Sequence, residues 1–537
     1  MRTHFLTALA VFFGLFILCP ELVSAEDSSK PNTAAWKLSG RSETSVEWKE
    51  SDDPDTTLDE GTSFRQELSV GLSRNHMGKR MGVNLRGRAT NDKQVDDRDA
   101  RLLYMNGYYH SQKASAELGD VAASFNPMVL STALMGTKVG VKDGTSSKGW
   151  EAKAIGGIVK SSWYDIYGPD DTDSVDRYVA GVQALGNFGT GKRLSFAAST
   201  LNDKKNHDLS DADQALAADP AEAITSGILW DWRFNRYFST RGETAFTRSD
   251  ANDAHTKENA GAVKIKLLTK PLPKSLRLNL NYERIDPDFN PVVATANNDT
   301  ERYEADTTWM PDRKVKVRLT LKESKDNLDN TLGGTRTTDD GVLFFTWRPD
   351  WLKRGELGLR NQYKTTDGRG TDQRIAISEI NANVRPKTGW KYGLGYIFTD
   401  INDDTANAED QMLHTLRTTI GWKKSLLANR MFRSSFRIDS NFIDRDSGDQ
   451  TSLGGKLDVG FDAGDLWSVD ATAQTRQAWR DEADDNEYHA YEMRGNYHPG
   501  GDRSKAFRLT AARREYDSDN GNATTEHVAK LSYLFSF

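Results

Sequence analysis

Few residues of this 537-residue chain have types and a spacing that could do chemistry. The segment Gly186-x4-Gly191-Lys192 matches most of a phosphate-binding loop, in which backbone N–H groups and a lysine hold phosphates while a Ser or Thr holds magnesium. Arg193 stands where that Ser or Thr would be, and no helical pattern follows. The segment is therefore better interpreted as a tight hairpin turn, and nucleotide binding is not expected.

Other catalytic and metal-binding patterns are also missing from the sequence. The nine histidines include no His-x-x-His pair, there is no Gly-x-Ser-x-Gly elbow, and the only cysteine is Cys19. Without thiols after Cys19, disulfides, thiolate metal sites and covalently attached haem are excluded. We expect no enzyme, no cofactor and no metal centre. Two aspartate clusters lack the glutamate of an EF-hand and favour a solvated acidic rim, bridged to lipopolysaccharide by divalent cations, over a dedicated site: Asp170, Asp171, Asp173 and Asp176, and Asp517 and Asp519.

The first 25 residues have the pattern of a removable export signal. Arg2 supplies a basic start, residues 5–18 an apolar stretch, and Val23-Ser24-Ala25 a small-residue cleavage site. Leu18 before Cys19 argues against a lipoprotein signal. No later apolar run approaches the roughly 18 to 20 residues of a membrane helix, and 10% aromatic residues is too many for a disordered chain.

The dominant pattern after the signal has a period of two, as in a strand with one apolar and one polar face. Residues 275–283 carry leucines and a tyrosine at even positions and polar residues at odd ones. Residues 314–322 do the same with Val and Leu at odd positions and Lys, Arg and Thr at even ones. Segments of about 9 to 13 residues suit a tilted membrane-crossing strand better than a soluble sheet.

The connections between these segments form two alternating sets. One set is short and basic or Pro-containing (75–80, 270–274, 311–314, 385–389), and the other is longer and acidic (52–61, 91–97, 164–176, 202–223, 324–340, 400–410, 481–487, 517–522). Short turns on one rim and long loops on the other are typical of outer-membrane barrels. The alternation predicts about 26 strands (range 24–28) with both termini on the periplasmic rim: 35–48, 63–74, 80–90, 100–110, 113–119, 133–142, 150–160, 176–186, 193–200, 224–233, 236–247, 258–268, 275–285, 300–310, 313–323, 337–347, 353–364, 373–384, 389–399, 411–422, 430–442, 451–461, 465–477, 487–497, 505–516 and 525–537.

The last strand has the most specific pattern in the chain. It alternates apolar residues up to a terminal phenylalanine, with Leu531, Tyr533, Phe535 and Phe537 on one face. This resembles the C-terminal strand of Gram-negative outer-membrane proteins, and the resemblance implies a β-signal read by the barrel-assembly machinery. A periplasmic girdle is expected from aromatic residues beside the short turns: Trp232, Tyr237, Trp309, Trp347, Trp351, Trp390, Trp422 and Trp467.

A barrel of this size needs something in its lumen. Strands about 4.8 Å apart and tilted by about 40° give a circumference of about 160 Å and a width of about 50 Å. Residues 26–34 are too few for a plug domain. Two loops are expected to act as internal fillers: the apolar segment 119–136 and the segment 202–223, with a short helix over 212–218 capped by Ser210. The lumen is expected to be lined by Arg277, Glu283, Arg302, Glu304, Asp306, Lys314, Lys316 and Arg318.

The sequence therefore predicts an all-β chain: a signal (1–25), a short periplasmic segment (26–34) and one transmembrane antiparallel up-and-down β-barrel (35–537) in a Gram-negative outer membrane. The expected function is a porin-like conduit in contact with lipids and lipopolysaccharide, without nucleic-acid partners. The strand number and the absence of a plug or appended domain resemble the large porins of porin–cytochrome electron conduits. That resemblance implies the alternative function, a scaffold sheathing a multihaem cytochrome whose haem belongs to the partner. A barrel enzyme has no supporting residues.

Overall fold

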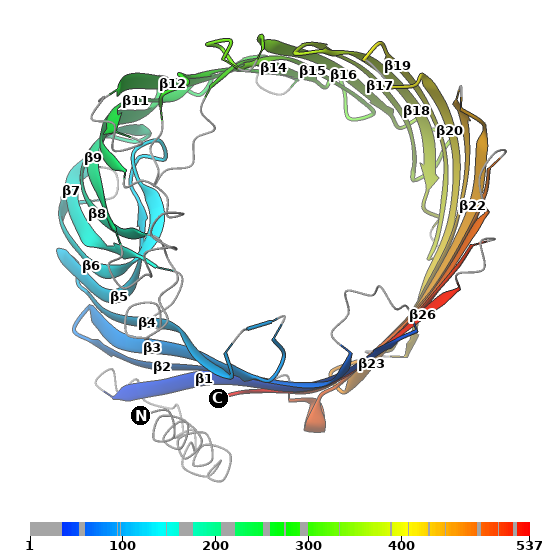
Figure 1. Ribbon diagram of the computed structural model, residues 1–537, viewed down its shortest axis with the longest axis horizontal. Helices are drawn as coiled ribbons and strands as arrows, with labels where there is room; N and C mark the ends of the chain where they lie inside the picture. The colour runs from blue at the N-terminus through cyan, green and yellow to red at the C-terminus, as the bar shows by residue number, and fades with distance from the viewer. Residues whose placement is uncertain are drawn as a thin grey trace.

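The chain forms one closed antiparallel β-barrel of 26 strands (Figure 1). The computed structural model describes residues 35–52, 60–93, 95–96, 98–145, 148–160, 175–205, 221–250, 258–272, 275–289, 299–331, 333–386, 389–405, 408–427, 430–445, 447–480, 485–502, 504–518 and 523–537. The strands are β1 (Trp36–Ser51), β2 (Gly61–His76), β3 (Lys79–Thr90), β4 (Ala100–His110), β5 (Ala114–Ser124), β6 (Ser131–Gly144), β7 (Lys148–Val159), β8 (Val175–Phe188), β9 (Lys192–Lys205), β10 (Glu222–Arg233), β11 (Phe238–Asp250), β12 (Glu258–Leu272), β13 (Leu276–Ile285), β14 (Thr300–Trp309), β15 (Val315–Asp326), β16 (Arg336–Trp347), β17 (Gly355–Gly368), β18 (Thr371–Val384), β19 (Trp390–Asp403), β20 (Gln411–Leu427), β21 (Arg430–Arg445), β22 (Gln450–Ala463), β23 (Trp467–Arg480), β24 (Asn486–Tyr497), β25 (Lys505–Ser518) and β26 (Thr524–Ser536).

The predicted fold class and strand number are confirmed, and every predicted strand overlaps an observed one. The observed strands reach 17 residues, in β20, which is longer than the alternation alone indicates. Among the described residues, no helix is long and apolar enough to cross a membrane. The predicted signal, residues 26–34 and the predicted helix over 212–218 lie outside the described residues.

Alternation along each strand separates two faces of the wall. In β15, Leu319 and Leu321 lie on one face with 38% and 51% of their surface exposed. Lys316 and Arg318 alternate with them on the other face. Residues directly opposite each other in an antiparallel pair point to the same face, so the register carries this division from strand to strand around the barrel.

The barrel is closed by hydrogen bonding between its first and last strands. β1 pairs antiparallel with β26 from Arg41 opposite Ser536 to Ser51 opposite Glu526. The backbone of Gly40 adds two hydrogen bonds with Phe537, of 2.8 and 3.0 Å. A Cβ at Gly40 would collide with the Phe537 ring, so glycine is needed for this close approach. No sheet edge is left unpaired along this seam.

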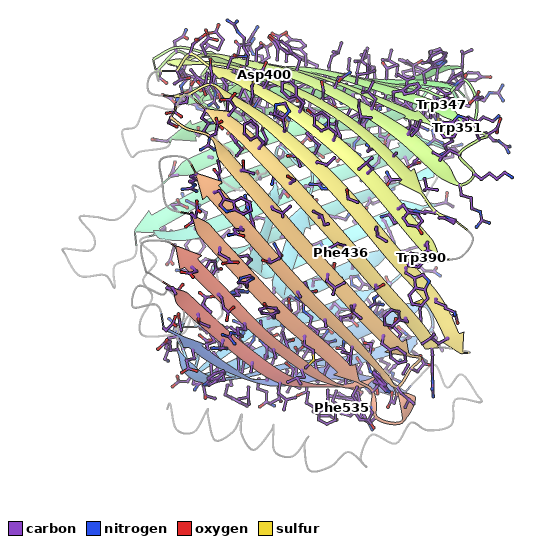
Figure 2. The ribbon with its side chains drawn as sticks, turned by 90° about the vertical axis from the view of Figure 1, so that its right-hand side faces the viewer. Trp347, Trp351, Trp390, Asp400, Phe436 and Phe535 are labelled. Atoms are coloured by element: carbon purple, nitrogen blue, oxygen red, sulfur yellow. The ribbon has the colours of Figure 1, made fainter. Side chains whose placement is uncertain are left out.

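The two rims differ in their connections, as expected for an outer-membrane barrel. β2 and β3 are joined by Met77 and Gly78 alone, both with positive φ (48° and 73°), as in a tight hairpin turn whose twist matches the strands. Figure 2 shows Trp347, Trp351 and Trp390 toward this short-turn end of the barrel and Asp400 at the other end. Trp390 contacts Trp422 at 5.9 Å between ring centroids, so neighbouring strands share a band of aromatic rings.

The hairpin of β5 and β6 leaves the wall and folds into the lumen (Figure 1). β4 pairs with β5 only from Asn106 opposite Gly119 to His110 opposite Ser115, whereas β5 continues to pair with β6 up to Ser124 opposite Ser131. Gly119 has a φ of 103°, and a Cβ there would collide with the backbone of Met105. We call residues 119–136 the inward hairpin. The predicted internal filler at these residues is confirmed.

Candidate functional site

The inward hairpin holds the main apolar cluster of the described structure. Val129 and Leu130 at its tip have no exposed surface, and Phe125, Met128, Val121 and Leu134 are also buried. They pack against side chains from β7 to β13 and the residues after it: Ile155, Val179, Ala197, Leu201, Ala223, Ala245, Ala260, Ala262, Ile285 and Phe289. An apolar segment that would be costly to expose to water is thus buried against one side of the barrel.

Small wall residues make room for this packing. A Cβ at Gly181 of β8 would lie 2.6 Å from the Leu130 side chain, and one at Gly227 of β10 would lie 2.8 Å from that of Val129. Both distances are too short for carbon atoms in contact, so these two glycines shape the wall to the tip of the inward hairpin.

Polar contacts fix the tip in one position. The backbone N–H of Met128 donates to the Glu243 carboxylate at 2.7 Å, and the Ser199 hydroxyl donates to the Val129 carbonyl at 2.9 Å. Asn126 is fully buried, and its side-chain oxygen accepts from the Ser195 hydroxyl at 2.9 Å. Buried polar groups without partners would destabilise this packing, so these bonds define both the position and the register of the inward hairpin.

The same contacts identify the lumen face of the whole wall. Glu243 lies under the inward hairpin, opposite Lys264 of β12. Lys264 lies opposite Glu283, and Glu283 opposite Arg302. Because opposite residues share a face, Glu283 and Arg302 also face the lumen.

The predicted lumen residues fall on this face along β13, β14 and β15, which we call the β13–β15 ladder. Glu283 pairs with Lys264 at 2.7 Å, and Arg318 with Asp306 at 2.6 Å. By parity Arg277, Glu304 and Lys316 share this face. Acidic and basic side chains alternate across the ladder, so cross-strand attraction balances much of its charge.

Lys314 differs from the other predicted lumen residues because it precedes β15 in a turn. Its Nζ bonds Asp350 Oδ2 of the next turn at 2.6 Å. This hydrogen bond, together with the attraction between the two charges, raises the pKa of the Lys314 ammonium above its ordinary value. Lys314 therefore joins two turns at the rim.

Two groups of basic residues on the lumen face were not predicted from the sequence. In β2 and β3, Glu67 is held by Arg86 at 2.8 Å, by Arg88 at 3.0 Å and by Arg65. A second basic region lies on β20 to β23, where Arg437 and Arg417 are examples. The same alternating parity that selected Arg318 would have found these residues.

The predicted β-signal residues Leu531, Tyr533, Phe535 and Phe537 alternate with the lumen-facing Lys530 and so point outward. The ring centroids of Tyr533 and Phe507 are 4.6 Å apart, and those of Phe535 and Phe537 are 5.6 Å apart. The outer surface at the seam is therefore aromatic.

Of the two predicted acidic clusters, Asp176 and Asp517 lie within the described residues. Within the described ranges, no group of three or more His, Cys, Asp or Glu side chains could hold a metal ion. Asp176 bonds Lys160 at 2.9 Å, while Asp170, Asp171, Asp173 and Asp519 lie outside these ranges.

Comparison with known proteins gives large β-barrels at low similarity. No protein-family profile matches the chain, and no curated protein sequence matches it. Among solved structures, the siderophore receptor PirA from Pseudomonas aeruginosa has a TM-score of 0.40 and 10% identity over 93% of this chain and 80% of its own. The P pilus usher PapC translocation pore has a TM-score of 0.36 and 9% identity, over 94% of this chain and 100% of its own. Pseudomonas aeruginosa OccK3 has a TM-score of 0.27 and 10% identity, over 93% of this chain and 96% of its own. At TM-scores this low, these structures carry no information about the function of this chain.

Proposed function

We propose that this protein is a pore of the Gram-negative outer membrane, with the inward hairpin as its constriction. The observation that carries the proposal is the closed wall with apolar side chains outside and charged side chains inside. A closed barrel satisfies every strand edge, which is what allows a sheet to cross hydrocarbon. The exported chain would be inserted by the barrel-assembly machinery, which reads the last strand.

The outer face supports contact with lipid. Over β6 to β11 it has an apolar hollow of about 910 Å³, whose lining includes Val139, Val182, Phe196 and Phe246. Aromatic residues at the short-turn end suit the boundary between hydrocarbon and headgroups. The acidic loops of the opposite rim would meet lipopolysaccharide, with divalent cations between the two sets of negative charges.

The experiment is conductance in planar bilayers with the purified full-length protein and with a variant lacking residues 121–134. We expect the intact protein to conduct and the shortened one to conduct several times more, because the deletion removes the material that narrows the lumen. Protein that inserts stably but never conducts would contradict the proposal.

A second candidate, a sheath around a partner protein, is favoured by the one-sided position of the inward hairpin. Among the described residues, the apolar side chains that pack against its tip belong to β7 to β13 and to the residues directly after β13, in a barrel about 50 Å wide by strand geometry. A multihaem cytochrome with its own haem groups is the partner to test. Purification of the native complex decides between the candidates: a second chain absorbing as haem supports the sheath, and a stable, poorly conducting barrel without a partner supports the self-constricted pore.

A further inference from the structure

Two adjoining hollows lie on the lumen face of β20 to β25, and the first of them carries more basic than acidic side chains. The first, of about 410 Å³, is lined by Arg417, Arg437, Lys456 and Arg476, with Asp439 as its only acidic residue. We call it the arginine hollow. The second, of about 570 Å³, shares Lys456 with it and extends to Arg494 and Arg514, which form ion pairs with Glu492 and Glu526.

The register places like charges side by side in the arginine hollow. Lys456 of β22 lies directly opposite Arg437 of β21. Opposed like charges destabilise a strand pair. In the β13–β15 ladder, by contrast, a basic residue lies opposite an acidic one, as with Lys322 and Glu304. The opposed cations of the arginine hollow are therefore not a general property of this barrel wall.

The acidic residue of the hollow is already shared. Asp439 accepts from Arg417 Nε at 2.8 Å and from Arg437 Nε at 2.5 Å. Lys456 lies 3.4 Å from Asp458, which also accepts from Thr472. The exposed side chain of Arg476 makes no hydrogen bond or ion pair with any described residue. Uncompensated donors therefore remain in the hollow.

A glycine at the centre of the arginine hollow leaves space that the basic side chains around it share. Gly454 of β22 lies between Asp439 on one side and Arg476 on the other. Arg437, Lys456 and Arg476 therefore surround a position where the wall has only backbone. Guanidinium groups present paired N–H donors that match the oxygens of phosphate and carboxylate groups.

We propose that the arginine hollow binds oxyanions, and that the solutes passing this pore carry phosphate, sulfate or carboxylate groups. The inference rests on the proposed pore function for its physiological meaning and adds the class of solute. An oxyanion in the hollow would accept from Arg437, Lys456 and Arg476 together and would relieve their mutual repulsion.

The test measures inorganic phosphate binding to the full-length barrel in detergent by calorimetry at low ionic strength. We expect the triple variant Arg437→Gln, Lys456→Gln, Arg476→Gln to bind phosphate at least tenfold more weakly. The matched control Arg302→Gln, Arg318→Gln, Lys322→Gln removes the same charge from the β13–β15 ladder and should keep the affinity. The single variant Arg476→Gln, which breaks no contact, should weaken binding in a barrel that folds normally.

Equal loss in both triple variants would show a general lumen potential and overturn the site, as would wild-type protein that binds no phosphate.

Reversal potentials under a KCl gradient test whether the pore selects for anions. Selectivity for chloride should be strong near 0.01 M salt, where the screening length is about 30 Å, and weak near 0.15 M, where it is about 8 Å. Cation selectivity at low salt would overturn the proposal that the pore passes anionic solutes. A barrel that binds phosphate but never conducts would instead contradict the pore function alone.

Discussion

The Glu243 carboxylate and the backbone N–H of Met128 are 2.7 Å apart, although 115 positions separate them in the chain. The bond joins the wall strand β11 to the tip of the inward hairpin, and Met128 is 3% exposed. A carboxylate on the lumen face therefore holds the segment that narrows the lumen.

Replacing Glu243 tests this attachment. Glu243→Ala leaves the buried Met128 N–H without an acceptor, at a cost of about 1 to 3 kcal/mol, whereas Glu243→Gln keeps an acceptor. We expect larger and noisier single-channel currents from the alanine variant and nearly normal currents from the glutamine variant. Identical currents in all three proteins would show that this bond does not position the inward hairpin.

Filling the space left by a wall glycine should displace the inward hairpin. Gly181→Val places a carbon atom where the Leu130 side chain lies, so we expect higher conductance from this variant. The control is Gly495→Val in β24, where a Cβ meets nothing within 4 Å. The two variants should insert equally, and an equal conductance change in both would contradict the packing described.

The two faces of β15 should tolerate charge differently. Leu319→Arg places a cation on the outward face near the middle of the strand and should cost about 2 to 4 kcal/mol of unfolding free energy in a bilayer. Lys316→Glu on the lumen face should change stability little. Denaturant unfolding in lipid vesicles measures both, and equal tolerance would mean that this strand does not face lipid.

The terminal aromatic residue should matter for insertion. Phe537→Ser removes the ring that packs against Gly40 at the seam, so we expect slower insertion and more periplasmic proteolysis. Heat-modifiable electrophoretic mobility reports the folded fraction. A variant that folds as quickly as the wild type would argue against the β-signal.

The orientation of the barrel is open to labelling on intact cells. Tags within 400–410 should be accessible, and tags at 270–274 should not, if the long loops face outward and the short turns face the periplasm. The reverse pattern would place both termini at the cell surface.

Strand positions were predictable because alternation is a local property of each segment. Leu319 and Lys316 reveal their faces without knowledge of any neighbour. The burial of the inward hairpin was also predictable, since its apolar residues stand among acidic loops. Its partners were not, because Gly181 and Gly227 carry meaning only once Leu130 and Val129 lie against them. The arginine hollow depends in the same way on register, which sets Arg437 opposite Lys456.

The pairing of β1 with β26 also makes the order of strands in the wall cyclic. Every other pair joins consecutive strands, so each strand has two antiparallel neighbours and none is first in space. A circularly permuted gene that linked β26 to β1 and began at another short turn would encode the same set of neighbouring pairs. The same barrel could therefore form from a chain in which the strands are synthesised from a different starting point.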